Sequence, residues 1–143
     1  MWKKNVFAVA AVFLCWSVLD FVIHGMILSG VYLKTAHLWR PMEEMNMGLM
    51  YLAGIVAAAC FVAVYSVFVR PKSLLTGLAY GCIFGLGTGF SMGYGTYAIM
   101  PVPHYLAAVW FLGTVAETSV AGLLTGWIVK DGTRESYTIV STK

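Results

Sequence analysis

The chain has 143 residues, of which 60% are hydrophobic and only 10% are charged. A soluble domain averages about 25% charged residues, and a chain this short cannot bury so much apolar surface in a water-facing core. The formal net charge of +3 is too small to indicate a nucleic-acid partner, so the composition predicts a single domain whose partner is the lipid bilayer.

Four long apolar runs follow one another along the chain, at about residues 5–33, 41–69, 73–100 and 103–129. Each exceeds the ~20 residues that a helix needs to cross ~30 Å of hydrocarbon. Unbroken runs of this length do not have the alternating pattern of a membrane β-barrel. The sequence therefore predicts an all-α integral membrane protein, a four-transmembrane-helix bundle, with a polar tail over residues 130–143.

Helix-boundary residues accompany these runs. Pro41, followed by Glu43 and Glu44, favours a helix start at the second run, because proline suits the first helical position and acids suit the first turn. Ser73 is a suitable N-cap for the third run, and Pro103 precedes the fourth. The connections are short, so consecutive helices are expected to be antiparallel neighbours.

The basic residues predict the orientation of the bundle. Antiparallel helices place seven of them at one end, namely Lys3, Lys4, Arg70, Lys72, Lys130, Arg134 and Lys143. Only Lys34 and Arg40 fall at the other end. Short flanks rich in Lys and Arg stay in the cytoplasm, so both termini are expected inside the cell, in a multi-pass protein of the inner membrane.

Glycine recurs every four residues through the third run, at Gly77, Gly81, Gly85, Gly89 and Gly93. This glycine ladder marks one helix face, where the lack of side chains lets another backbone come close. The fourth run has a matching stripe of small residues, at Thr114, Thr118, Gly122 and Gly126. The ladder predicts a helix-packing face, either inside the bundle or against a partner chain.

Ionisable residues lie inside two of the runs. Asp20 and His24 are four residues apart, on one face of the first helix, and Glu117 is near the centre of the fourth. The antiparallel arrangement brings the three side chains to a similar depth. A charge at the bilayer centre costs at least ~2.5–3.5 kcal/mol, so such residues indicate a functional site by default. Two explanations stay open: hydrogen bonds that hold the helices together, or a proton relay, metal site or acid–base pair.

A second polar group is expected at the outer end. It contains His37 and His104, with four methionines at Met42, Met45, Met47 and Met50. Imidazole and thioether groups suit copper, although solvated histidines and interfacial methionines are the simpler interpretation.

Asp20, His24 and His37 have the spacing D-x3-H-x12-H. This spacing resembles a metal-ligand set in the small membrane subunit of the copper membrane monooxygenases, the particulate methane and ammonia monooxygenase family. The resemblance covers about 18 residues and implies that these three side chains bind copper or another transition-metal ion. The overall layout also resembles small uncharacterised bacterial four-helix membrane proteins, which supports the topology and supplies no activity.

Three functions remain open from the sequence. The leading hypothesis is an accessory or structural subunit of a larger membrane complex or a homo-oligomer. The chain is small and has glycine-rich helix faces, and its sequence has no nucleotide-binding, nucleophile-elbow or zinc-protease motif. The alternatives are a copper-type metal-binding protein that uses Asp20 and His24, and an acid–base enzyme that acts on a lipid-soluble substrate.

Overall fold

The computed structural model describes residues 2–130, and all regular structure in this part of the chain is helical. Helix α1 (Trp2–Asp20) continues as a π-helical segment (Phe21–Ile27), which leads to the short helix α2 (Ser29–Lys34). Two 3₁₀ turns (Ala36–Leu38 and Met42–Glu44) precede α3 (Met47–Phe68), α4 (Leu74–Ile99) and α5 (His104–Ile128). Apart from residue 130, the predicted tail lies outside the described residues.

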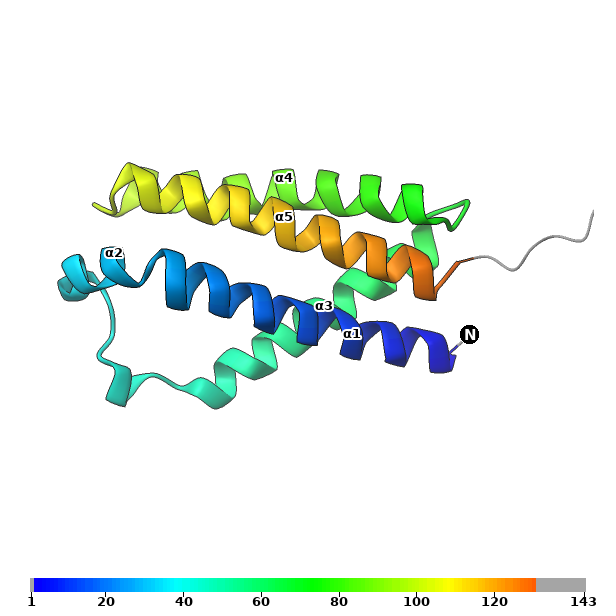
Figure 1. Ribbon diagram of the computed structural model, residues 1–143, viewed down its shortest axis with the longest axis horizontal. Coiled ribbons are helices and arrows are strands. Elements are labelled where there is room, and N and C mark those ends of the chain that lie inside the picture. The colour runs from blue at the N-terminus through cyan, green and yellow to red at the C-terminus, as the bar shows by residue number, and fades with distance from the viewer. Residues whose placement is uncertain (1, 131–143) are drawn as a thin grey trace, which may run out of the picture.

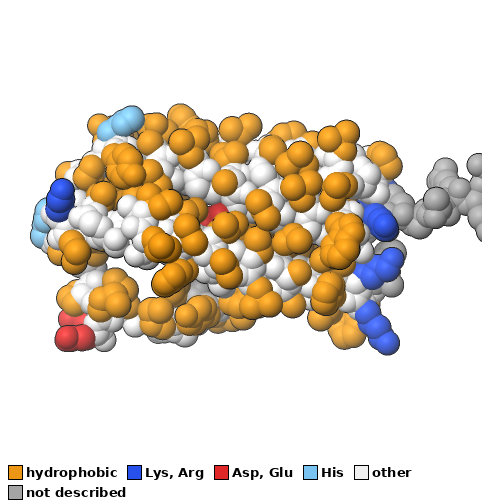
Figure 2. Space-filling model, in the orientation of Figure 1, with side chains coloured by type: hydrophobic (Ala, Val, Ile, Leu, Met, Phe, Trp, Pro, Cys, Tyr) orange, Lys and Arg blue, Asp and Glu red, His pale blue; other side chains and the backbone are white. Residues whose placement is uncertain are grey.

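Four helices are long and apolar enough to cross a membrane, namely Trp2–Ile27, Met47–Phe68, Leu74–Ile99 and His104–Ile128. This confirms the all-helical class and the four apolar spans. Most of the Lys and Arg side chains visible in Figure 2 lie at one end of the molecule, and hydrophobic side chains cover the surface between the ends. We call this the basic end, which carries Lys3, Lys4 and Lys130, and the opposite one the far end, which carries α2.

The second span starts later than the range 41–69 that the sequence predicts. Pro41 begins only a 3₁₀ turn, and α3 starts at Met47, where the Asn46 side chain accepts a hydrogen bond of 2.9 Å from the Leu49 amide. Asn is among the best N-caps, whereas the acids after Pro41 cannot supply that bond. The capping role of Ser73 is confirmed, because its hydroxyl accepts from the Thr76 amide at 3.2 Å.

Helices α4 and α5 form the most intimate pair and run side by side along their length (Figure 1). The glycine ladder of α4 is buried against α5. A Cβ atom added at Gly77 would overlap the Gly122 carbonyl oxygen, and one added at Gly93 would lie 2.5 Å from the Ala107 carbonyl oxygen. The two backbones therefore approach so closely that only glycine fits along this face of α4.

Helix α3 crosses the bundle obliquely, and its first half, toward the far end, lies apart from the other helices (Figure 1). Its buried side chains all lie in the second half, at Ala58, Phe61, Val62, Tyr65 and Ser66. The Tyr65 hydroxyl ties this half to the start of α4, because it donates to the Ser73 carbonyl at 2.9 Å and accepts from the Ser73 amide at 3.1 Å. Within residues 47–57, by contrast, every residue is exposed except Gly54, which is half-buried.

The apolar interior is divided in two. One cluster lies toward the basic end, where α1, α3 and α5 meet, and includes Val12, Phe61 and Ala121. The other lies toward the far end, where Leu28 packs with Leu106 and Trp110. Along the chain, Asp20 falls between Val12 and Leu28, and Glu117 between Trp110 and Ala121, so each lies between members of the two clusters.

Candidate functional site

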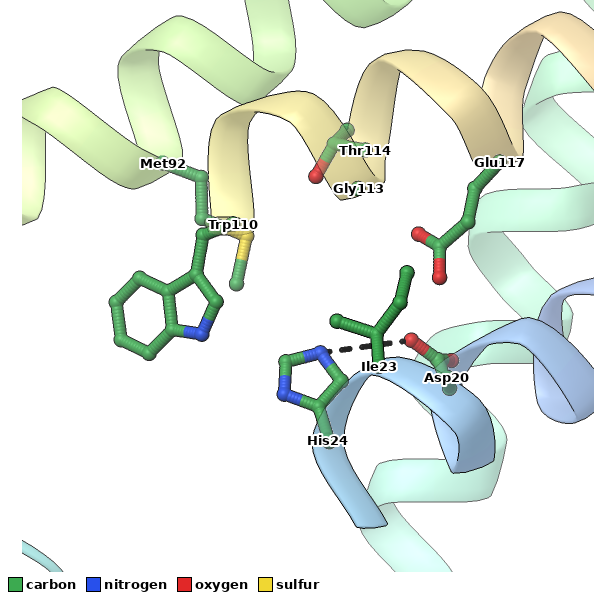
Figure 3. Close-up of a pocket in the computed structure, with 8 residues that line it drawn as sticks. All are labelled: Asp20, Ile23, His24, Met92, Trp110, Gly113, Thr114 and Glu117. Atoms are coloured by element: carbon green, nitrogen blue, oxygen red, sulfur yellow. Dashed lines mark ion pairs between the residues drawn. The ribbon is translucent and has the colours of Figure 1, made fainter. Parts of the chain in front are cut away.

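A cavity of about 70 Å³ is lined by residues of the first span, α4 and α5 (Figure 3). Three of its lining residues come from the first span, one from α4 and four from α5: Asp20, Ile23, His24, Met92, Trp110, Gly113, Thr114 and Glu117. Gly113 keeps it open on the α5 side, since a Cβ there would lie 3.0 Å from the Ile23 side chain. The space is large enough for several water molecules or a small polar head group.

The π-helical segment builds one wall of this cavity. The Leu28 amide donates to the Ile23 carbonyl at 2.9 Å, which is the i→i+5 bond of a π turn. A wider turn changes the direction of the side chains that follow it, and Leu28 itself is fully buried at the far-end cluster. Single π turns occur frequently at functional sites, and here the turn contains His24.

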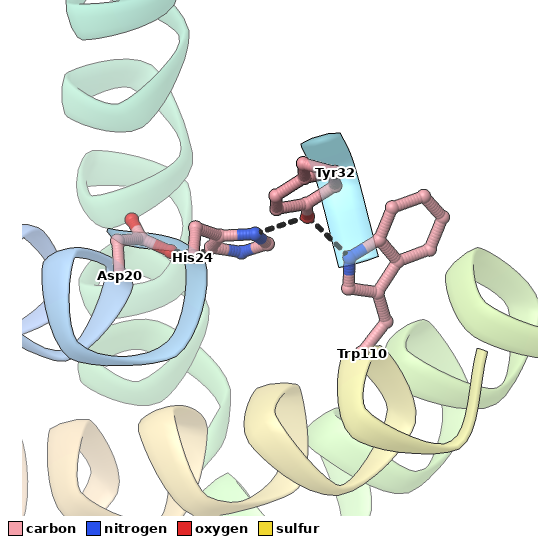
Figure 4. A network of polar contacts seen from close by, with 4 residues as sticks. All are labelled: Asp20, His24, Tyr32 and Trp110. Atoms are coloured by element: carbon pink, nitrogen blue, oxygen red, sulfur yellow. Dashed lines mark hydrogen bonds and ion pairs between the residues drawn. The ribbon is translucent and has the colours of Figure 1, made fainter. Parts of the chain in front are cut away.

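Hydrogen bonds link His24 to two aromatic residues (Figure 4). Its Nδ1 atom lies 2.6 Å from the Tyr32 hydroxyl, and the indole Nε1 of Trp110 donates to the same hydroxyl at 2.9 Å. The His24 and Tyr32 rings also stack, with centroids 5.9 Å apart and planes 20° apart. The Tyr32 hydroxyl therefore joins the first span to α5.

Two proton arrangements satisfy the contact between His24 and Tyr32, because a hydroxyl can accept from Nδ1–H or donate to bare Nδ1. In the second arrangement, Tyr32 accepts from Trp110 and donates its own proton to Nδ1 of His24. The ring proton of neutral His24 is then on Nε2, which lies 3.7 Å from Oδ1 of Asp20. Tyr32 lies beyond the first span, and burial raises the pKa of its hydroxyl, a rise that the Trp110 hydrogen bond opposes.

The two carboxyl groups differ in their surroundings. Asp20 is 57% exposed, and acidic atoms are visible in the middle of the otherwise apolar surface (Figure 2). Glu117 points across the cavity toward Asp20, with which it interacts electrostatically (Figure 3). Its Oε1 atom is buried and has no hydrogen-bond partner among the described residues. An unpaired buried polar atom costs about 1–3 kcal/mol, so Glu117 is an unusual feature in a folded chain.

The structure brings Asp20, His24 and Glu117 to one cavity and leaves His37 and His104 elsewhere. Both of these histidines are exposed, and the His104 ring packs against Tyr94 and Tyr97. Among residues 2–130, no three His, Cys, Asp or Glu side chains lie close enough together to hold a metal ion. The set Asp20, His24 and His37 is therefore not assembled in this conformation.

The exposed outer methionines are not gathered into the cavity either. Met42, Met47 and Met50 are all exposed, and so is Met45. The methionine that does line the cavity is Met92, on α4.

Sequence reasoning missed Trp110, which lines the cavity, and Tyr32, which bonds to His24 beside it. Trp110 precedes Thr114 by four residues and Glu117 by seven, a spacing that places all three on one face of α5. That pattern was available in the sequence. Tyr32 had no comparable signal, because its contact with His24 depends on the π turn between them.

Comparisons with known proteins add no relationship. Neither the family models nor the curated proteins nor the solved structures gave a match to the chain.

Proposed function

We propose that the chain is a multi-pass protein of the inner cell membrane with both termini in the cytoplasm. The four long apolar helices support insertion, and the excess of Lys and Arg at the basic end supports the orientation. Reporter fusions at Lys143 and within residues 34–40 test the topology. They should report opposite compartments, and a periplasmic signal from the C-terminal fusion would refute it.

Within that membrane, the cavity is proposed to bind the polar head of a small lipid-soluble molecule and to exchange protons with it. The observation that carries this proposal is Oε1 of Glu117, a buried oxygen without a partner that belongs to a residue lining the cavity. A bound molecule that donates to this oxygen would remove the cost of leaving it unpaired.

Asp20 and His24 supply the acid–base chemistry of the proposal. Asp20 is exposed on a surface that acyl chains would cover, where an ionised carboxylate is unfavourable unless a ligand or a proton reaches it. His24 lies between Asp20 and the hydroxyl of Tyr32, so a proton has a short route from the cavity toward the outer end. General acid–base work needs groups placed in this way around a bound substrate.

Native mass spectrometry of the chain released from lipid nanodiscs tests the binding role. Wild-type protein should carry a small-molecule adduct that Glu117→Gln loses, because the amide replaces the carboxyl group of a residue that lines the cavity. Glu43→Gln is the matched control, since Glu43 is exposed at the far end and touches no part of the cavity. Identical adduct spectra for all three proteins would contradict the proposal.

A second candidate function is an accessory subunit of a larger membrane assembly. The observation that favours it is the first half of α3, where every residue within 47–57 except Gly54 is exposed. Helices in membranes associate through close packing, and Ala53, Gly54 and Ala57 offer a small-residue face for that purpose. Purification in mild detergent should give a particle larger than one chain of 15.6 kDa plus its detergent, and a strictly monomeric particle would exclude this role.

A further inference from the structure

The cavity is lined by acidic groups without a permanent cation. Two carboxyl groups and the His24 ring face it, and none of the described residues that line it is Lys or Arg. The Lys and Arg side chains gather at the ends of the molecule, far from its middle (Figure 2). Carboxylates held close together in a medium of low dielectric repel each other strongly when both are ionised, and a positive charge between them removes that repulsion.

The hydrogen-bonding groups of the cavity favour a ligand that donates hydrogen bonds. The indole N–H of Trp110 is already used by the Tyr32 hydroxyl, and the donors left on the wall are the His24 ring and the Thr114 hydroxyl. Oε1 of Glu117 is an acceptor without a partner, and the exposed carboxylate of Asp20 can accept further hydrogen bonds. A ligand that only accepts hydrogen bonds, such as a ketone or an ester, would leave these oxygens unsatisfied. A ligand that donates would satisfy them.

The remaining walls favour a cation over a neutral donor. The indole of Trp110 lines the cavity, and tryptophan is the best aromatic partner for a cation. Met92 adds a polarizable thioether and Ile23 an apolar surface that suit methylene groups next to a charge. The volume of about 70 Å³ fits a head group only, and Asp20 is exposed, so a longer tail would lie outside, among the acyl chains.

We propose that the ligand is a lipophilic ammonium, an alkylamine whose charged head lies between Asp20 and Glu117 and whose tail extends into the bilayer. This inference rests on the proposed binding function and names its ligand class. The ammonium N–H groups donate to the two carboxyl groups, and the Trp110 ring contacts the head group. Charge-assisted hydrogen bonds of this kind are about twice as strong as neutral ones.

The experiment compares two probes of equal chain length, n-hexylammonium and n-hexanol, by calorimetric titration into nanodiscs that contain the full chain. Empty nanodiscs supply the reference for partitioning into lipid. At neutral pH, hexylammonium should bind saturably, and hexanol at least about tenfold more weakly, which corresponds to one lost charge-assisted interaction of about 1.4 kcal/mol. Glu117→Gln and Asp20→Asn should each weaken hexylammonium binding about tenfold or more, whereas Glu43→Gln should bind like the wild type.

The outcomes separate this inference from the function on which it rests. Saturable hexanol binding that equals or exceeds hexylammonium binding would overturn the ammonium proposal and leave the binding site intact. No saturable binding of either probe would overturn both. Hexylammonium binding that neither Glu117→Gln nor Asp20→Asn weakens would mean that the cation lies elsewhere. The comparison of the two probes on wild-type protein needs no variant, so it stands even if a variant fails to fold.

Discussion

The close approach of α4 and α5 predicts that one added methyl group lowers the stability at one glycine of α4 and not at another. Gly81 is buried against α5, whereas Gly87, on the same helix, has no atom within 4 Å of the position that a Cβ would take. Gly81→Ala and Gly87→Ala therefore add the same atoms to the same helix in two different surroundings. The gain in helix propensity from glycine to alanine, about 1 kcal/mol, is common to both variants and cancels in the comparison.

The size of the effect follows from the distances at Gly81. A Cβ there would overlap the Thr118 carbonyl oxygen and lie 2.8 Å from the carbonyl carbon, whereas ordinary contact begins at 3.4 Å. The helices would have to separate by at least about 0.6 Å, the difference between these two values, and by more to clear the carbonyl oxygen, because backbone atoms cannot rotate away. Such overpacking costs about 1–3 kcal/mol, because the van der Waals attraction along the whole interface weakens as the two helices move apart.

Equilibrium unfolding in mixed micelles of mild detergent and dodecyl sulfate, followed by far-ultraviolet circular dichroism, measures this difference. Gly81→Ala should unfold at a lower fraction of dodecyl sulfate than the wild type, and Gly87→Ala at the same or a higher fraction. Equal midpoints for the two alanine variants would show that α4 and α5 do not approach each other in the way described, and the packing argument would fail.

Three further predictions concern the network, the α3 cap and the metal alternative. Tyr32→Phe should lower the free energy of unfolding by about 1–3 kcal/mol, because it leaves Trp110 Nε1 and His24 Nδ1 without their partner. Tyr51→Phe, on the exposed part of α3, should leave the stability unchanged. Equal stability of the two variants would refute the bridging role of Tyr32. Asn46→Ala should cost about 1 kcal/mol by removing the cap of α3, and an unchanged unfolding midpoint would argue for a helix start nearer Pro41. Because no three-ligand group forms among the described residues, copper-loaded protein should hold well below one equivalent of metal. Stoichiometric copper binding that His24→Ala abolishes would contradict this prediction and support the metal-binding alternative.

Helix existence and much of the helix punctuation were predictable from the sequence. Long apolar runs form helices in lipid, because only a helix or a closed barrel satisfies the backbone there and a barrel needs alternating residues. The Ser73 cap was predictable because it depends on residues within one turn of each other. The start of α3 was missed by six residues because Pro41 and the acids after it compete with a better cap at Asn46. Both signals are local, and the bond that decided between them was visible only in the folded chain.

The sequence by itself also determined which residues are chemically unusual, because Asp20, His24 and Glu117 are ionisable groups inside apolar runs. Only the tertiary structure decided what surrounds them. The π turn at residues 21–27 sets the contact of His24 with Tyr32, and the packing of α5 on α1 leaves Glu117 Oε1 unpaired beside a cavity. Hydrophobic patterning sets which residues enter lipid, whereas side-chain contacts between antiparallel helices depend on their relative shift and rotation, which no single helix encodes.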